Sequence, residues 1–343
     1  MRLLLTISAF LILAYGHAQT LGGSATYNFL KLPSGPLLTA AGGANVSLQA
    51  DDAGLSVNNP GLLHAAQHYQ VQMAFNSFIA GIKTYALTGV YYYEPYQTSM
   101  AAHIYFLDYG SIPQTDASGN ENGNFRPVDF VIQFSAARPY LDKWNYGASL
   151  KFIHSSYGQY RSSAIATDVG IHYSDSANNF YAGFTAKNMG FQLKTYAGEG
   201  EDLPFDLQVG VTKKLANAPF GFSLTAQQLH RFNVLYNDTT FNNENDLPGN
   251  DKFINKLFNH IVVATHIYIG RNLEAGFGYS HLRRNELNAG TAGNGLNGFS
   301  MGIRLKFKKI QFAYSRSNYQ RNLVYNQVGI TLHADKLFGF TDL

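Results

Sequence analysis

The chain alternates apolar residues with polar or small ones along most of its length, from Tyr69 to the C-terminus. Such alternation places successive side chains on opposite faces of a β-strand. The runs lie near residues 68–77, 80–92, 98–109, 127–138, 144–154, 164–174, 179–187, 205–214, 219–228, 261–269, 272–281, 298–308, 309–317 and 324–333. Most have about the 9–11 residues that a tilted strand needs to cross a bilayer. The pattern predicts an all-β fold, an antiparallel transmembrane barrel of fourteen strands.

One face of these runs is apolar and the other is polar or small. In the run at 298–308, for example, Ile303 faces one side and its neighbour Arg304 faces the other. The polar set would line the lumen, so the sequence argues against an apolar pocket inside the barrel. The charged residues expected in the lumen are Lys151, Asp168, Asp206, Glu274, Arg304 and Lys306. Pairing across the lumen is one role for them, and ligand binding is the alternative.

A soluble β-sandwich would also alternate, and the lengths of the connections argue against it. Every second connection is short, and apart from the first hairpin the intervening ones are long. The long connections are 110–126, 155–163, 188–204, 229–260 and 282–297. Short turns at one end and long loops at the other are typical of the periplasmic and extracellular ends of a membrane barrel.

Tyrosines gather near the expected strand ends. They are Tyr91, Tyr92, Tyr93, Tyr109, Tyr140, Tyr157, Tyr160, Tyr181 and Tyr319. Aromatic residues at these positions favour girdles at the two membrane interfaces. Edge aromatics of a sandwich are the alternative interpretation.

The residues before the alternating runs have a different character. A positively charged start, an apolar run over 3–13 and small residues before Gln19 predict a secretory signal peptide at 1–18. The next part contains the Gly/Ala-rich block PLLTAAGGANVSLQADDAGLSVNNPGLL, which ends in turn-forming residues. We therefore predict a compact hatch over 19–65 and a barrel over 66–343.

The composition agrees with export to an outer membrane. Only 14% of the residues are Asp, Glu, Lys or Arg, whereas soluble domains carry about 25%. The chain has no cysteine, so disulfides and thiolate metal sites are excluded. Its net charge of +3 is too small to indicate a nucleic-acid partner.

No group of residues forms a recognisable catalytic, cofactor-binding or metal-binding motif. Asp51 and Asp52 are adjacent and would point to opposite sides of an extended chain, which does not suit a catalytic pair. His64 and His68 have helical spacing for a metal, but they lie at the junction of hatch and barrel, where a continuous helix is not expected. We predict a protein that is not an enzyme and has no cofactor or metal.

The block at 36–63 and the segment KNMGFQLKTYAGEGEDLPFDLQ at 187–208 resemble the PorQ family of the type IX secretion system. That family is related to PorV and, more distantly, to the FadL fatty-acid transporters, and the resemblance covers nearly the whole mature chain. It implies a hatch motif at Gly42, Gly43, Asp51, Asp52, Asn59 and Pro60. Gly61 departs from the pattern, since the superfamily often has alanine after Asn-Pro.

The resemblance implies a barrel in a Bacteroidetes-type outer membrane, in contact with its lipid. There it would anchor a PorZ-like surface protein through its extracellular loops, chiefly 229–260, 188–204 and 282–297, beside the PorU sortase and the PorV barrel. The alternative, based on the shared hatch motif, is a FadL-like transporter or binder of hydrophobic ligands.

Overall fold

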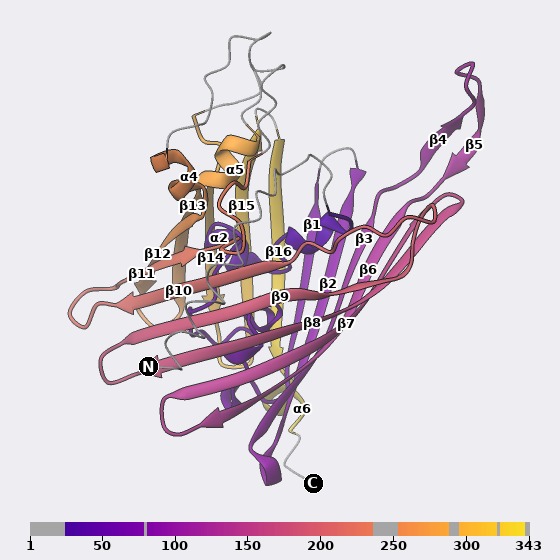
Figure 1. The fold of residues 1–343 in the computed structure, drawn as a ribbon. Helices are drawn as coiled ribbons and strands as arrows, with labels where there is room; N and C mark the ends of the chain where they lie inside the picture. Colours follow the sequence, from indigo (N-terminus) through magenta and orange to yellow (C-terminus); the bar gives the residue numbers. More distant parts are fainter. Residues whose placement is uncertain (1–24, 79–80, 236–252, 288–294, 321–322, 340–343) are drawn as a thin grey trace, which may run out of the picture.

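The structure, a computed structural model, describes residues 25–78, 81–235, 253–287, 295–320 and 323–339. Within this part of the chain, fourteen strands form one closed antiparallel barrel, in which β1 pairs with both β2 and β16 (Figure 1). The barrel strands are β1 Gln70–Ser77, β2 Lys83–Tyr93, β3 Thr98–Asp108, β6 Val128–Tyr140, β7 Trp144–Tyr157, β8 Tyr160–Asp175, β9 Phe180–Lys194, β10 Asp206–Lys214, β11 Phe220–Ala226, β12 Ile261–Ile269, β13 Leu273–Ser280, β14 Phe299–Lys306, β15 Ile310–Gln320 and β16 Leu323–His333. The predicted barrel is confirmed, and closure of a single sheet excludes the sandwich, which needs two.

Some predictions fall on residues outside the described part. The signal peptide at 1–18, the first residues of the predicted hatch and most of the loop at 229–260 lie there.

Strands β7 and β8 are longer than the alternation predicts. Tyr157 ends β7 and pairs with Tyr160, which begins β8, so the long loop expected at 155–163 is wrong. The segment HSSYGQYRSS around this turn has few apolar residues. It therefore carries no alternation signal, although its backbone pairs as in the rest of the sheet.

The predicted loop at 110–126 contains a further hairpin. Its strands, β4 (Ile112–Thr115) and β5 (Glu121–Phe125), form a separate sheet that projects beyond the barrel (Figure 1). We call this end of the barrel the long-loop end. It also carries α4 (Phe253–Asn259) and α5 (His281–Glu286).

The opposite, short-turn end carries two short helices. These are η6 (Glu94–Tyr96) and α6 (Ala334–Phe338). No helix among the described residues is long and apolar enough to cross a membrane.

The outer surface is apolar where the predicted faces place it. Exposed and buried residues alternate along β14 from Phe299 to Leu305, and β7, β10 and β13 repeat the pattern. Ile303 is 52% exposed, whereas Arg304 is 4% exposed and points into the barrel. An outward apolar band of this kind is the lipid-facing surface of a membrane barrel.

The predicted aromatic girdle is only partly correct. Tyr140 is exposed at the short-turn end. Tyr181 instead faces the lumen, where Lys214 Nζ lies 5.3 Å from its ring centroid. Tyr109 and Tyr157 also point inward, because both of their hydroxyls donate to a buried carboxylate. Position near a strand end therefore does not fix which face of the wall a tyrosine occupies.

Residues 25–69, which we call the N-terminal segment, lie inside the barrel (Figure 1). Their short helices are η1 Asn28–Lys31, α2 Pro36–Ala40, η2 Ala53–Val57, η3 Pro60–Leu62 and η4 Ala65–Gln67. Local chemistry explains these limits. The side chain of Asp52 caps η2 and that of Asn59 caps η3, each accepting from a glycine N–H. Gly42 and Gly43, with φ of 89° and 95°, end α2.

The lumen is not polar throughout, so the expectation of a polar interior is wrong in part. Toward the long-loop end, the barrel strands β1–β3 and β6–β8 carry inward apolar residues that we call the inner apolar wall. These are Ala74, Ala86, Tyr105, Leu107, Val131, Ile153, Ala164 and Ala166. Tyr27 and Phe29 of the N-terminal segment pack against it, and the Phe29 and Tyr105 ring centroids are 6.4 Å apart. Both faces of these strands are apolar here, so alternation could not reveal the wall.

The depth of an outward-facing residue in the lipid bilayer predicts how much a charge at that position costs. Replacing Ile303, midway along β14, with lysine should destabilise the barrel in lipid vesicles by about 2–4 kcal/mol. The matched change Phe307→Lys, just beyond the end of β14, should cost about 1 kcal/mol or less because it lies near the interface. Urea unfolding in vesicles measures both. Equal costs would contradict the assignment of this face to lipid.

Candidate functional site

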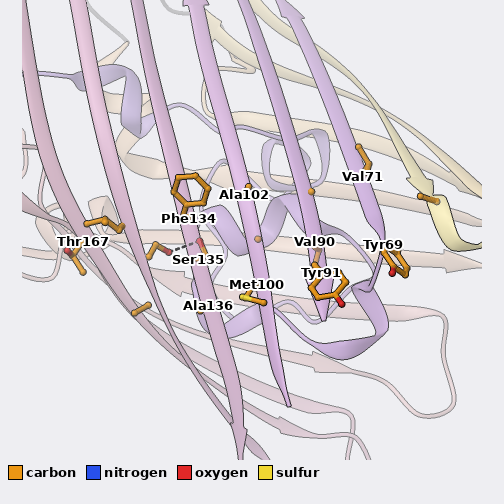
Figure 2. Close-up of a pocket in the computed structure, with 16 residues that line it drawn as sticks. Tyr69, Val71, Val90, Tyr91, Met100, Ala102, Phe134, Ser135, Ala136 and Thr167 are labelled. Atoms are coloured by element: carbon orange, nitrogen blue, oxygen red, sulfur yellow. Dashed lines mark hydrogen bonds between the residues drawn. The ribbon is translucent and has the colours of Figure 1, made fainter. Parts of the chain in front are cut away.

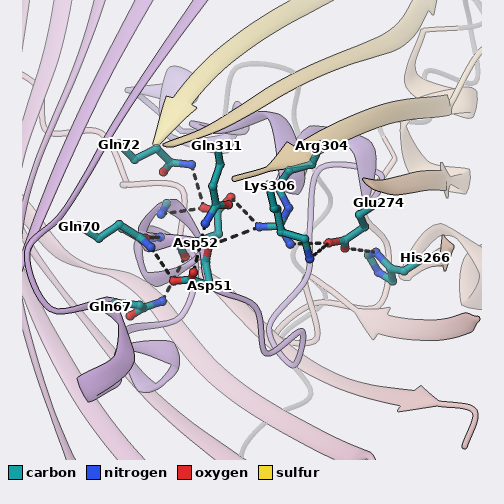
Figure 3. A network of polar contacts seen from close by, with 12 residues as sticks. Asp51, Asp52, Gln67, Gln70, Gln72, His266, Glu274, Arg304, Lys306 and Gln311 are labelled. Atoms are coloured by element: carbon teal, nitrogen blue, oxygen red, sulfur yellow. Dashed lines mark hydrogen bonds and ion pairs between the residues drawn. The ribbon is translucent and has the colours of Figure 1, made fainter. Parts of the chain in front are cut away.

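The N-terminal segment is held near the short-turn end by its two adjacent aspartates (Figure 3). Asp52, 3% exposed, accepts hydrogen bonds from the Gln72 side chain (2.8 Å) and the Gly54 backbone (3.0 Å). Asp51 accepts from the side chains of Gln70 (2.6 Å) and Gln311 (3.1 Å). The two carboxylates diverge toward different partners, so they form anchors to the barrel wall and no catalytic pair.

Arg304 joins these aspartates to the charges on the nearby strands β13 and β14. Its guanidinium lies 3.6 Å from Asp52 and 2.5 Å from Glu274, which also accepts from Lys306 at 3.1 Å. Figure 3 shows the resulting chain of contacts continuing to His266, 3.9 Å from Glu274. Buried charges are stable only when they are paired and hydrogen-bonded, so this network locks the N-terminal segment to β13 and β14.

Asn59 and Pro60 lie at a second place, against β7 and β8. The Asn59 side chain donates to the Val46 carbonyl (2.8 Å) and its oxygen accepts from the Gly61 N–H (2.9 Å). Gly61 has a steric reason to be glycine, because a Cβ there would lie 3.0 Å from backbone atoms of Ile171 and His172. Its departure from the expected alanine lets η3 approach β8 closely.

Gly42 and Gly43 lie at a third place, near the long-loop end of β13. Arg283 of α5 donates to the Gly42 carbonyl at 2.8 Å. A Cβ on Gly43 would lie 2.1 Å from that guanidinium, so the glycine admits the arginine. The six motif residues therefore form three separate contacts with the wall, not one cluster.

Glycines of the strands are the contacts that sequence reasoning missed. A Cβ on Gly183 would lie 1.9 Å from the Val46 carbonyl oxygen, and one on Gly278 would lie 2.2 Å from the Gly42 nitrogen. Other glycines touched by the N-terminal segment in the same way are Gly147, Gly170, Gly302 and Gly329. The alternation places these glycines on the inward face of the strands. The sequence does not show that the N-terminal segment packs against them there.

The remaining lumen charges divide into two groups. Lys151 lies 2.6 Å from Asp168 and donates to Asn188 at 2.8 Å, so these charges are paired inside the wall. Asp206 accepts from the Gln228 backbone (2.6 Å) and the Gln208 side chain (2.5 Å). Among the described residues, Asp206 has no ion pair.

A shallow groove of about 790 Å³ lies on the outer face of β1, β2, β3, β6 and β7 (Figure 2). Small residues form its floor, among them Gly89, Ala102 and Ala136, and Tyr91 and Phe134 stand beside them. The groove is on the apolar surface, where acyl chains would fill it. Within the described chain, no three His, Asp or Glu residues are placed to hold a metal ion.

Solved structures with a similar fold include two hydrocarbon channels. The CymD monoaromatic hydrocarbon channel aligns with a TM-score of 0.53 at 12% identity, over 90% of this chain and 97% of that one. A mutant of the TodX monoaromatic hydrocarbon channel gives 0.52 at 12% identity, over 88% and 98%. A Pseudomonas aeruginosa FadL homologue gives 0.46 at 10% identity, over 87% and 96%, a score too low to support an argument.

No protein-family model and no curated protein matches the sequence. At 12% identity the two channels establish the fold and nothing finer. The chain thus has the architecture of an outer-membrane β-barrel. Nothing in these comparisons supports the PorQ or type IX secretion assignment specifically.

The ionic network predicts how the N-terminal segment can be released. Arg304→Met leaves Asp52 and Glu274 without their main cation, which should cost about 3–5 kcal/mol of unfolding free energy. Lys306→Met should cost less, since the Lys306 side chain is 29% exposed. Because the chain has no cysteine, maleimide labelling of Ser56→Cys reports release directly. Faster labelling in the Lys306 variant than in the Arg304 variant would contradict the proposed anchorage.

The contact at Gly183 predicts that a methyl group there loosens the N-terminal segment, whereas a methyl group at Gly89, on the outer face, does not. Gly183→Ala places a methyl group against the Val46 carbonyl and should loosen the N-terminal segment, whereas a Cβ on Gly89 meets nothing within 4 Å. The Gly183 variant should therefore label faster at Ser56→Cys, and the Gly89→Ala control should label like the parent. Identical rates for the two variants would show that the contact is not needed.

Proposed function

We propose that this protein is an outer-membrane channel that admits small hydrophobic molecules, with the N-terminal segment acting as its hatch. The observation that carries the proposal is the inner apolar wall, which lines the lumen toward the long-loop end on strands β1–β3 and β6–β8. Transport of polar solutes would not need such a wall, because polar lumen residues serve them better.

The contacts of the N-terminal segment differ between its two ends, and this difference supports a hatch. Phe29 packs against the inner apolar wall without a side-chain hydrogen bond, and Tyr27 packs against it while its hydroxyl is hydrogen-bonded to Ser162. Asp51 and Asp52 are held by directed hydrogen bonds and ion pairs near the short-turn end. A hydrophobic molecule can replace the first kind of contact, since apolar contacts are non-directional. The second kind keeps the segment in the barrel.

The names of the similar structures support the same class of ligand. CymD and TodX are described as monoaromatic hydrocarbon channels, and they share the barrel architecture. This favours uptake over the attachment function that the family resemblance implies.

Uptake of a labelled monoaromatic hydrocarbon by cells that have this barrel as their only channel tests the proposal. Val131→Asn puts an amide on the inner apolar wall and should slow uptake several-fold, because a polar group there disfavours apolar contact. Thr225→Asn is the matched control, since Thr225 is equally buried and lies on β11, away from that wall. No uptake by the parent protein, correctly folded in the membrane, would overturn the proposal.

A second candidate function is favoured by one observation, the apolar surface of α4 at the long-loop end. Phe253 is 68% exposed, and Ile254, Leu257 and Phe258 are exposed as well. An exposed apolar cluster on a cell-surface helix suits attachment of a protein. The partner proposed from the resemblance is a PorZ-like surface protein, held beside PorU and PorV.

A pull-down from the native outer membrane in gentle detergent tests attachment. The tagged protein should retain one stoichiometric surface protein, and Phe253→Ser combined with Phe258→Ser should release it while the barrel stays folded. Deletion of the β4–β5 hairpin is the control at the same end. If the barrel is recovered alone, or carries only lipid, attachment is abandoned.

A further inference from the structure

A tyrosine-lined pocket of about 500 Å³ opens at the long-loop end. The β4–β5 hairpin leaves the barrel at this end (Figure 1). The pocket is formed by the start of the N-terminal segment, the ends of β3 and β7, the starts of β6 and β8 and the connection after β9. Its tyrosines are Tyr27, Tyr109, Tyr157, Tyr160 and Tyr196, and its charged residues are Asp129 and Glu201. Neither lysine nor arginine lines it.

The carboxylate of Asp129 lies at the base of this pocket and is 1% exposed. One oxygen accepts hydrogen bonds from the hydroxyls of Tyr109 (2.6 Å) and Tyr157 (2.8 Å). The other oxygen is buried and has no hydrogen-bond partner, and no cation within the described chain pairs with Asp129. A buried carboxylate without a positively charged partner destabilises the protein, so a bound cation from outside the chain would stabilise it.

Four tyrosine rings of this pocket form a row in which each ring is tilted or edge-on to the next. The centroid of Tyr157 lies 5.8 Å from that of Tyr109 and 5.9 Å from that of Tyr196, and Tyr196 lies 6.5 Å from Tyr27. Burial, reinforced by the charge of Asp129, raises the pKa of the Tyr109 hydroxyl, which therefore stays a donor at neutral pH. The pocket thus combines π-faces with negative charge.

The geometry points to a binding site for an organic cation, an ammonium or guanidinium group, in this pocket. Such a group is attracted by the faces of aromatic rings and by a carboxylate beneath them. A hard metal ion is a poorer occupant, because it needs about six oxygen ligands and the pocket offers two carboxylates. A pure hydrocarbon would leave Asp129 uncompensated. The site adjoins the inner apolar wall, because Tyr27 and Phe29 line the pocket and also pack against that wall. Its preference for a cation comes from Asp129, which the proposed transport does not use.

The cation has two possible sources, a free amine or a lysine or arginine side chain of another protein. Saturation-transfer NMR on the full-length protein in detergent micelles distinguishes them. The probes are choline for the free source and Nα-acetyl-lysinamide and Nα-acetyl-argininamide for the side chains. The neutral probe 3,3-dimethyl-1-butanol has the shape of choline with carbon in place of the charged nitrogen.

We expect at least one charged probe to bind about fivefold or more tightly than the neutral one, as cation–π and carboxylate contacts together would give. Asp129→Asn should remove that preference. Tyr196→Leu, which leaves both hydrogen bonds to Asp129 in place, should weaken binding about two- to fivefold. Tyr140→Leu, at the opposite end of the barrel, should bind like the parent.

The shift in mobility of the unheated protein on a gel confirms that each variant is folded. If Asp129→Asn does not fold, the site is still tested by two comparisons, charged against neutral probes on the parent protein and the parent protein against Tyr196→Leu. Equal binding of choline and 3,3-dimethyl-1-butanol, with both side-chain probes no tighter than the neutral one, would overturn the proposal. So would parent-like binding of the charged probes to folded Asp129→Asn.

Discussion

The structure depends on direct contact between the backbone of the N-terminal segment and the barrel wall. A barrel of fourteen strands is too wide for its own side chains to fill. Here the N-terminal segment occupies the lumen. Wall glycines such as Gly183 and Gly278 let the segment lie within van der Waals distance of the strands. At those positions, any larger residue would hold the segment away from its hydrogen-bonding partners.

That contact divides the lumen into two regions of different chemistry. Near the short-turn end, Asp52 and Arg304 place charges in a buried network where each carboxylate has a cation or several donors. Toward the long-loop end, Ile153 and its neighbours give an apolar surface covered by Phe29. Directed bonds resist displacement more than apolar contacts do, so Asp52 and Gly42, which such bonds hold, are fixed more firmly than Phe29.

The long-loop end carries features that the barrel itself does not require. The β4–β5 hairpin and the exposed helix α4 contribute nothing to closure of the sheet. The tyrosine pocket is built partly on β6, β7 and β8, but closure does not require its unpaired carboxylate Asp129. Loops on a rigid scaffold are where binding residues are usually found. Uptake of a hydrophobic molecule, attachment of a protein and recognition of a cation use different parts of this end, so they can be separated by mutation.

The sequence by itself determined the barrel, its fourteen strands and the lipid-facing side of β14, because alternation has a period of two wherever one face is apolar and the other polar. It could not determine the inner apolar wall, to which β6 and β7 contribute Val131 and Ile153 from inward faces that are otherwise mainly polar or small. Nor could it determine the turn at Tyr157 and Tyr160, where neither face is apolar. Tertiary structure alone decided which residues meet across the lumen. Arg304 and Asp52 are far apart in the chain, and only closure of the barrel around the N-terminal segment brings such residues into contact.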